Sequence, residues 1–376
     1  MSASPPVPTR QVPKSHSKPQ ADPRSAIPAP TNAIKAAGKA EFDQILDTDA
    51  DLDDASARKE PLPGVAIVET NTDWMLPELS AVLPTSGYLG PDDSATGQTN
   101  RPVIVADVDG TLWGDPSLPE GRRLLPRFVA RMEEWIESRG LVFVINTGMT
   151  FERFQGVFSL QDVPIWPTHA LVAETEIYHR MDGNFYVDHQ PFNDQSRHAR
   201  RQVVKQLRPV IDEWVGQWGT QVHILRWQRQ KYDVMFMCAD GDHARRLERL
   251  ICQTLSRHGM HHLSVMRNRR MVAIYSGLYS KRRLLAELVR IRGWVPTQVL
   301  TIGDDVNDLS MLTKDLSTPA CVGNAVQEVQ HQVRTQNGYL ARAGFGHGAL
   351  EAIEWFLAHF DRQLASEGHK PYRRPL

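Results

Sequence analysis

Two aspartates, Asp107 and Asp109, stand at the end of the apolar run "VIVADVD", and Gly110 follows them directly. A charged group at the end of a buried strand is costly unless it serves a ligand. A pair of carboxylates there can bind a divalent cation through oxygen, and one can act as a nucleophile while its neighbour transfers protons. Gly110 would let the chain turn sharply, so that both side chains face outward. Taken alone, the same residue types are also typical of an ordinary turn.

A second acidic cluster lies in "TIGDDVNDLSML", where Asp304, Asp305 and Asp308 follow another apolar run. Ligands of open α/β sheets bind beyond the carboxyl ends of the strands, so both clusters are expected at one edge of the sheet. Carboxylates so close together repel one another. Mg²⁺, which binds one or two carboxylates together with substrate phosphate oxygens, relieves that repulsion. The two clusters therefore predict one shared Mg²⁺ site.

Thr147 and Lys281 are expected beside these carboxylates. Thr147 ends the apolar run "FVINT", and Lys281 stands at the start of the helical pattern "SKRRLLAELVRIRG". A hydroxyl and an ammonium at this edge can hold the negative charge that spreads over a phosphoryl group during transfer. Each residue also has an ordinary alternative, because Thr147 could cap a helix and Lys281 could be a solvated helix residue.

Apolar strands that alternate with helical patterns position these residues. The runs "VIVADVD", "LVFVINTG" and "VLTIGDD" are of buried-strand type. Residues 126–140 have helical apolar spacing, with Pro126 suited to the first turn and Gly140 to the stop. Such an alternation is typical of a parallel sheet covered on both faces. We therefore predict an α/β fold with a Rossmann-like parallel-sheet core.

Residues 194–275 interrupt this alternation and are predicted to form an inserted α+β module. The pattern indicates one long helix over residues 194–218, two strands, a second helix and two more strands. The core is then divided into residues 101–193 and 276–362, with a tail at 363–376. The insert carries fifteen Lys and Arg against seven Asp and Glu. Solvated helix faces explain part of this excess, and the rest suggests an anionic ligand.

Composition limits the remaining possibilities. The chain has 376 residues and a net charge of −1, and no apolar run approaches the roughly 18 residues of a membrane span, so neither a membrane nor a nucleic acid is the expected partner. Its three cysteines, Cys238, Cys252 and Cys321, lack metal-type spacing and suggest reduced thiols in a cytoplasmic protein. Residues 1–100, rich in Pro and Ser and then in acids, predict a largely disordered arm. Its basic opening also fits an organelle transit peptide.

Four motifs in a fixed order resemble those of the haloacid dehalogenase superfamily of phosphatases. They are "DVDGT", "INTG", Lys281 and "GDDVND". An insert between the second and third motifs resembles the α/β cap of the branch that includes sucrose-phosphate phosphatase, trehalose-phosphate phosphatase, phosphomannomutase and the Cof-type phosphatases. The segments "CVGNAVQEV" and "AGFGHGALEAIEWFLAHF" are similar to the closing part of the sucrose-phosphatase and Cof-type members. The resemblance covers roughly residues 102–360.

The resemblance implies a role for each motif residue. Asp107 would be the nucleophile that forms an aspartyl-phosphate. Asp109 would protonate the leaving alcohol and then activate water. Thr147, Gly148 and Lys281 would bind the phosphoryl oxygens.

The resemblance also implies a Mg²⁺ site. Its ligands would be Asp107, the backbone carbonyl of Asp109, and Asp304, with Asp308 in support. Three positions depart from the family pattern: Met149 where many relatives have Arg, Asp305 in place of a common Ser, and the residue after Lys281, which is not Gly. None of these departures removes a core catalytic group, so phosphomonoester hydrolysis is the expected activity.

The cap supplies specificity in this branch, and here the stretch "HILRWQRQKYDVMF" is both basic and aromatic. Trp is a platform for sugar rings, and Arg and Lys bind a second anionic group, which favours a phosphorylated sugar such as sucrose 6-phosphate. The candidate substrate residues are Arg226, Trp227, Arg229 and Lys231. Two other functions stay open, a phosphosugar mutase and a non-catalytic protein that binds a sugar phosphate. The sequence does not indicate an oligomeric state.

Overall fold

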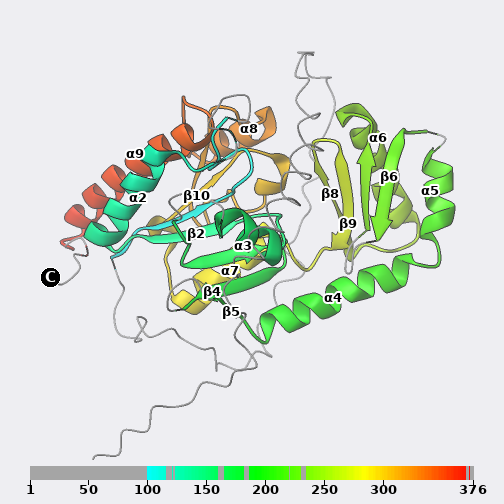
Figure 1. Cartoon of the computed structure of the whole chain (residues 1–376), viewed down its shortest axis with the longest axis horizontal. Coiled ribbons are helices and arrows are strands. Elements are labelled where there is room, and N and C mark those ends of the chain that lie inside the picture. The colour runs from blue at the N-terminus through cyan, green and yellow to red at the C-terminus, as the bar shows by residue number, and fades with distance from the viewer. Residues whose placement is uncertain are drawn as a thin grey trace, which may run out of the picture.

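The computed structural model describes residues 100–115, 121, 123–159, 165–181, 186–219, 221–229, 234–369 and 372. The arm predicted over residues 1–100 lies outside this part of the chain, apart from Asn100. The described residues form two sheets with their helices, a core and a smaller cap (Figure 1). Among them, no helix is both long enough and apolar enough to cross a membrane.

Within the described residues, eight strands form the core sheet in the order β12-β11-β10-β1-β2-β3-β4-β5. The strands are β1 (Val103–Ala106), β2 (Val142–Asn146), β3 (His169–Val172), β4 (Glu176–Arg180), β5 (Tyr186–Asp188), β10 (Val299–Gly303), β11 (Thr318–Cys321) and β12 (Tyr339–Leu340). The strands from β12 to β3 pair in parallel, as predicted. The pairs β3–β4 and β4–β5 are antiparallel, which the sequence analysis did not foresee.

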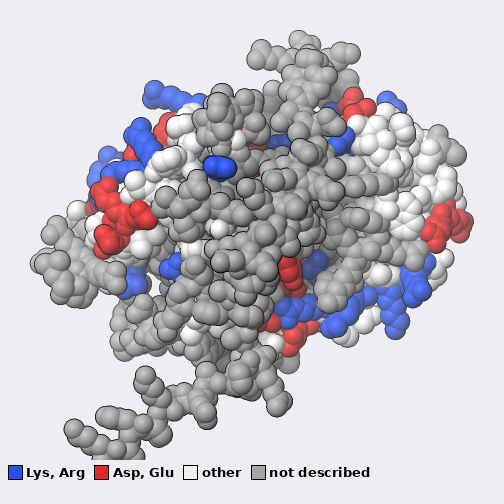
Figure 2. All heavy atoms as spheres, in the orientation of Figure 1, with Lys and Arg blue, Asp and Glu red and all other residues white. Residues whose placement is uncertain are grey.

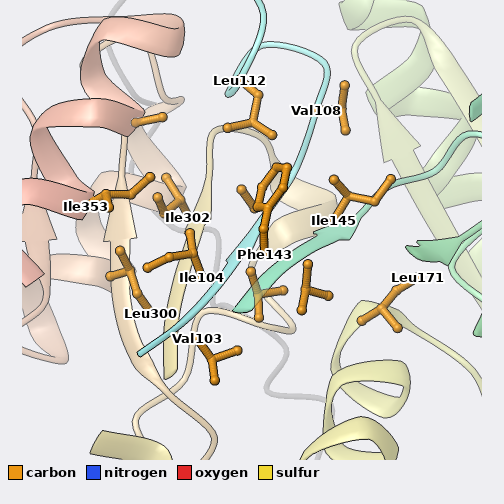
Figure 3. Close-up of a cluster of buried hydrophobic side chains, with 14 of the residues drawn as sticks. Val103, Ile104, Val108, Leu112, Phe143, Ile145, Leu171, Leu300, Ile302 and Ile353 are labelled. Atoms are coloured by element: carbon orange, nitrogen blue, oxygen red, sulfur yellow. The ribbon is translucent and has the colours of Figure 1, made fainter. Parts of the chain in front are cut away.

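The register of the central strands brings the motif residues to one edge of the sheet. Ala106, the last residue of β1, lies opposite Ile302 of β10 and Ile145 of β2. All four residues of β1 are buried, so the sheet is covered on both faces. Figure 3 shows the apolar side chains of these strands packed together, with Ile353 reaching them from a covering helix.

Helices and two short 3₁₀ turns connect and cover the strands. They are α2 (Pro126–Arg139), α3 (Phe151–Ser159), α7 (Lys281–Arg292), α8 (Gln327–Thr335), α9 (Phe345–Ser366), η2 (Pro296–Gln298) and η3 (Val306–Asp308). Helix α2 begins at Pro126, and Gly140 ends it with a φ of 60°, as predicted. Helices α2 and α9 lie side by side (Figure 1).

The cap has the predicted order of two helical segments and two strand pairs. Its elements are α4 (Phe192–Leu207), α5 (Ile211–Gly219), β6 (Ile224–Arg229), β7 (Val234–Cys238), α6 (Gly241–Arg257), β8 (Leu263–Asn268) and β9 (Met271–Ser276). The prediction of one helix over residues 194–218 was wrong, because α4 ends at Leu207 and α5 begins at Ile211. Pro209 explains the break, since it cannot donate a backbone hydrogen bond to the preceding turn.

Part of the basic excess of the insert lies on a solvated helix face. Figure 2 shows Lys and Arg side chains along α4, where Arg201 and Lys205 are exposed. These residues need no ligand to explain their charge.

A chain of three buried histidines joins the antiparallel edge of the core sheet to α7. Nδ1 of His179 lies 3.0 Å from Nδ1 of His169, and Nε2 of His179 lies 3.0 Å from Nδ1 of His189. Nε2 of His189 lies 3.7 Å from Oε1 of Glu287 on α7. Each pair of facing nitrogens can share one proton, so three neutral imidazoles satisfy the chain.

Candidate active site

Asp107 and Gly110 place the first motif against the second acidic loop. The backbone N–H of Asp107 donates to the carbonyl of Ile302 at 3.0 Å, so the chain stays paired to β10 as it reaches the sheet edge. Gly110 has a φ of 84°, and a Cβ added there would clash with the carboxylate of Asp304. Only glycine therefore allows the two loops to approach so closely.

Lys281 is the first residue of α7 and lies fully buried between the two motifs. Its Nζ donates to Oδ1 of Asp107 and to Oδ1 of Asp308, both at 2.6 Å. The side-chain amide of Asn146, at the end of β2, donates to the backbone carbonyl of Lys281 at 2.9 Å. One ammonium therefore bridges carboxylates from two different strand ends. The alternative prediction for Lys281, that it is a solvated residue on the surface of a helix, was wrong.

Asp308 and Thr111 hold the second acidic loop in shape. Oδ2 of Asp308 accepts the backbone N–H of Asp304 at 2.8 Å and that of Asp305 at 3.2 Å. The hydroxyl of Thr111 donates to Oδ1 of Asp304 at 2.8 Å. Asp308 therefore has both oxygens engaged by the protein, whereas Asp304 keeps its second oxygen for another ligand.

The charges of this group fit a divalent cation. Asp107, Asp304 and Asp308 each offer a carboxylate oxygen within 4.8 Å of the other two. When all three are ionised, the carboxylates and the ammonium sum to −2, which a divalent cation neutralises. Burial, reinforced by Asp308 and Asp304, raises the pKa of Asp107 well above its usual range, although Lys281 opposes the shift. Burial raises the pKa of Asp304 to about 8. A set of oxygen donors is what Mg²⁺ selects.

Lys281 stays charged within this group. Burial acts to lower its pKa, but the carboxylates of Asp107, Asp308 and Glu174 outweigh that effect and raise the pKa above its ordinary value. The ammonium is therefore a permanent positive charge beneath the floor of the site.

Asp109, Thr147 and Gly148 line a cavity that opens above this floor. Asp109 is exposed, and the indole N–H of Trp113 donates to its Oδ1 at 3.1 Å. Thr147 is buried, and its Oγ1 accepts the backbone N–H of Met149 at 3.2 Å. The predicted catalytic, phosphate-binding and metal residues are thus brought together by three strand ends and the start of α7.

The cavity has a volume of about 460 Å³ and lies between the core and one face of the cap sheet. The cap contributes mainly apolar side chains to it: Met235, Met237, Met266, Met271, Ala273 and Tyr275. We call these six residues the cap roof. A volume of this size is typical of a site for a small organic ligand.

The structure places the half-buried Trp227 against the cap core and not at the cavity. Trp227 pairs across the sheet with Phe236, and their rings stack with centroids 6.3 Å apart. Phe236 is fully buried beneath the cap helices, so Trp227 shares its face and not that of the roof. The side chains of Arg226 and Arg229, and all of Lys231, lie outside the described part of the chain.

Glu174 and four arginines line the cavity but were missed by the sequence analysis. Ala173 and Glu174 form a tight turn after β3 with φ values of 51° and 57°, and Oε1 of Glu174 accepts from the side chain of Asn307 at 3.2 Å. The arginines are Arg153, Arg200, Arg269 and Arg270. No motif marks them, because each comes from a different element or from a turn without the usual turn residues.

A parallel-sheet core with an acidic carboxyl edge, a bridging lysine and an inserted cap defines a phosphatase of the haloacid dehalogenase superfamily. The family model for sucrose-6F-phosphate phosphohydrolase matches residues 100–357. The chain therefore belongs to this family, as the four motifs predicted.

Individual relatives agree with this assignment. A phosphoglycolate phosphatase of Methanoculleus marisnigri is 24% identical over 260 residues, which are 68% of this chain and 97% of that protein. A phosphoglycolate phosphatase of Methanococcoides burtonii is 31% identical over 106 residues, which are 28% of this chain and 44% of that protein. The sucrose-phosphatase from Synechocystis sp. PCC6803, solved in complex with sucrose and phosphate, is 19% identical with a TM-score of 0.51. This likeness covers 70% of this chain and 99% of that one, and it shows the fold.

Proposed function

We propose that this protein is a Mg²⁺-dependent phosphomonoester hydrolase that acts on a sugar phosphate through an aspartyl-phosphate intermediate. The observation that carries the proposal is the buried ammonium of Lys281, 2.6 Å from both Asp107 and Asp308, beneath a cavity that Asp107 and Asp109 line. This arrangement offers a nucleophile, a proton carrier and fixed positive charge to one phosphoryl group.

In the first half-reaction, an oxygen of Asp107 attacks phosphorus while the bond from phosphorus to the ester oxygen breaks. Asp109 gives its proton to the departing oxygen, which leaves as an alcohol. The ammonium of Lys281 and the hydroxyl of Thr147 hold the phosphoryl oxygens as their negative charge spreads.

In the second half-reaction, Asp109 takes a proton from a water molecule that attacks the same phosphorus. The bond from phosphorus to Asp107 breaks, and both the carboxylate and inorganic phosphate are released. The indole of Trp113, which donates to Asp109 at 3.1 Å, orients that carboxylate towards the cavity in both steps.

Asp107, the backbone carbonyl of Asp109, and Asp304 are the residues that would hold Mg²⁺. Bound there, the ion would neutralise charge on the transferring phosphoryl group. Asp308 fixes the backbone of the loop instead, since the protein already occupies both of its oxygens.

The sugar phosphate assignment rests on three supports. The family model is that of a sucrose-6F-phosphate phosphohydrolase, and the similar Synechocystis enzyme was solved with sucrose and phosphate. The cavity of about 460 Å³ is also large enough for a sugar ring beside the phosphoryl site. The phosphoglycolate phosphatase relatives make phosphorylated hydroxy acids part of the same test.

A phosphate-release assay with purified protein tests the proposal. We expect hydrolysis of 4-nitrophenyl phosphate that chelator abolishes and Mg²⁺ restores, and faster hydrolysis of at least one phosphorylated sugar in a panel that includes sucrose 6-phosphate and phosphoglycolate. Full activity in excess chelator would remove the metal from the proposal. Equal rates for all members of the panel would contradict the proposal that the substrate is a sugar phosphate.

A further inference from the structure

The cavity has two chemically different sides. Its floor is formed by Asp107, Asp304 and Asp305, with Lys281 buried beneath it, whereas arginines line the rest of the core side and the cap. Lys281 and the expected cation neutralise Asp107, Asp304 and Asp308, and Asp109, Glu174 and Asp305 add three further carboxylates to the lining. The cap arginines Arg269 and Arg270 also line the cavity, and no described carboxylate lies within 4.0 Å of either guanidinium group.

Arg269 and Arg270 form the two-residue turn between β8 and β9, and both line the cavity. Asn268 pairs with Met271 across this turn. Arg269 has a φ of 48°, a left-handed conformation that turns of this length usually give to Gly, Asn or Asp. A residue held against its backbone preference at a cavity wall indicates that its side chain has a use there.

The two guanidinium groups are available to a ligand. Neither forms an ion pair within 4.0 Å with a described residue, whereas Arg245 and Arg267 of the cap pair with Asp242 and Glu248. Nε of Arg270 is buried and lacks a hydrogen-bond partner among the described residues. Burial raises the pKa of the Asp305 carboxyl, and the positive charge of Arg269 opposes that shift without a hydrogen bond between the two side chains. A buried donor without a partner is costly, and an incoming anion would relieve that cost.

The cap roof offers few hydrogen-bonding groups that could recognise the hydroxyl groups of a neutral sugar. Four of its six residues are methionines, one is Ala273, and Tyr275 supplies the only hydroxyl. A thioether accepts hydrogen bonds only weakly and cannot donate one. The hydroxyl groups of a sugar that face this roof would therefore lose their hydrogen bonds to water and gain none in return. The roof fits the carbon backbone of a ligand, and the arginine turn fits a charged group.

We propose that the substrate carries a second anionic group, a carboxylate or a second phosphate, which Arg269 and Arg270 bind while its phosphate ester lies over Asp107. The substrate class is thus a phosphorylated sugar acid or a sugar bisphosphate. This inference rests on the proposed phosphatase function and narrows its substrate. A planar guanidinium binds either anion through two parallel hydrogen bonds.

Matched substrate pairs test this assignment. 6-Phosphogluconate and sorbitol 6-phosphate differ only in a carboxylate against a hydroxymethyl group, and glucose 1,6-bisphosphate and glucose 6-phosphate differ in a second phosphate. We expect wild-type kcat/KM to favour the anionic member of at least one pair by about tenfold or more, the scale of one charge-assisted hydrogen bond. The favoured pair identifies the anion.

Variants assign the preference to the turn. Arg269→Gln and Arg270→Gln should each reduce the anionic-to-neutral ratio by about tenfold. Arg249→Gln, which changes an exposed arginine of α6 outside the cavity, should leave the ratio unchanged. Both substrates of a pair are measured on the same protein sample. Partial unfolding therefore lowers the apparent kcat/KM of both substrates equally and leaves their ratio unchanged.

Two outcomes would overturn the assignment. One is a wild-type enzyme that hydrolyses the neutral member of both pairs at least as well, and the other is a preference that both Gln variants retain. Failure of the underlying phosphatase function looks different, because wild-type protein with Mg²⁺ would then release no phosphate from 4-nitrophenyl phosphate either.

Discussion

Acid should destabilise the fold through His179, the middle member of the buried histidine chain. Burial lowers the pKa of His179 from 6.5 to about 3, with His189 adding to the shift and Asp188 opposing it. The pKa of His169 is also lowered, first by burial and then by His179, His189 and Arg180. At pH 5 the imidazole of His179 is therefore neutral in the folded protein, whereas the unfolded chain protonates it.

The sign and size of the effect follow from proton linkage. When the pKa of a histidine is lower in the folded state than in the unfolded state, the unfolded state binds more protons at low pH. The free energy of unfolding therefore decreases as the pH decreases. For His179 this stabilisation is complete above pH 6.5 and is lost as the pH falls towards 3. At pH 5 the loss is about 2 kcal/mol for His179 alone. That is a large part of a typical stability of about 5 to 15 kcal/mol.

Hydrogen exchange of the β3–β4 hairpin, compared at pH 7.5 and pH 5.0 after correction for intrinsic exchange rates, measures this loss locally. Wild-type protein should lose about 2 kcal/mol or more of protection on acidification. His179→Gln should lose about 2 kcal/mol less, whatever its stability at pH 7.5, because the amide does not titrate. His261→Gln, at an exposed histidine, should behave as wild type. An unchanged pH dependence in His179→Gln would refute the reasoning.

The site gives three further predictions. Asp107→Asn should abolish phosphate release while circular dichroism stays unchanged, because an amide cannot form the acyl-phosphate, and near-normal turnover would contradict the mechanism. Lys281→Met should lower the free energy of unfolding by about 3 to 5 kcal/mol in denaturant titrations, since it leaves buried carboxylates without a counter-ion, and added Mg²⁺ should recover part of the loss. Asp304→Asn should raise the Mg²⁺ concentration for half-maximal activity more than Asp308→Asn does, and the reverse order would make Asp308 the direct ligand.

The central sheet was predictable because its strands are nearly continuous apolar runs. β1, β2 and β10 are buried on both faces, and that burial leaves a clear pattern in the sequence. β4 and β5 carry histidine, arginine and aspartate, and their antiparallel pairing depends on contacts made only in the folded edge. The break between α4 and α5 was visible at Pro209, but the apolar spacing on either side masked it.

The floor of the site was predictable for a related reason. Its residues follow the strands whose order in the sheet is fixed, so their spacing along the chain determines their meeting point. No comparable pattern in the sequence predicted the position of the cap arginines. Arg269 and Arg270 reach the cavity only because β8 and η3 pack together across the boundary between cap and core. A contact between residues so far apart in the chain leaves no local pattern in either segment.

The cap sheet shows why its working face could not be chosen from residue types. Alternate residues of β7 face opposite sides, with Val234 and Phe236 buried in the cap core and Met235 and Met237 half-buried at the cavity. Both sets are apolar, so alternation indicates two faces without saying which one meets the substrate. Trp227 suggested the wrong face because an aromatic ring suits a sugar and a core equally well. In our proposal, the arginine turn at the edge of the roof therefore carries the specificity that the roof lacks.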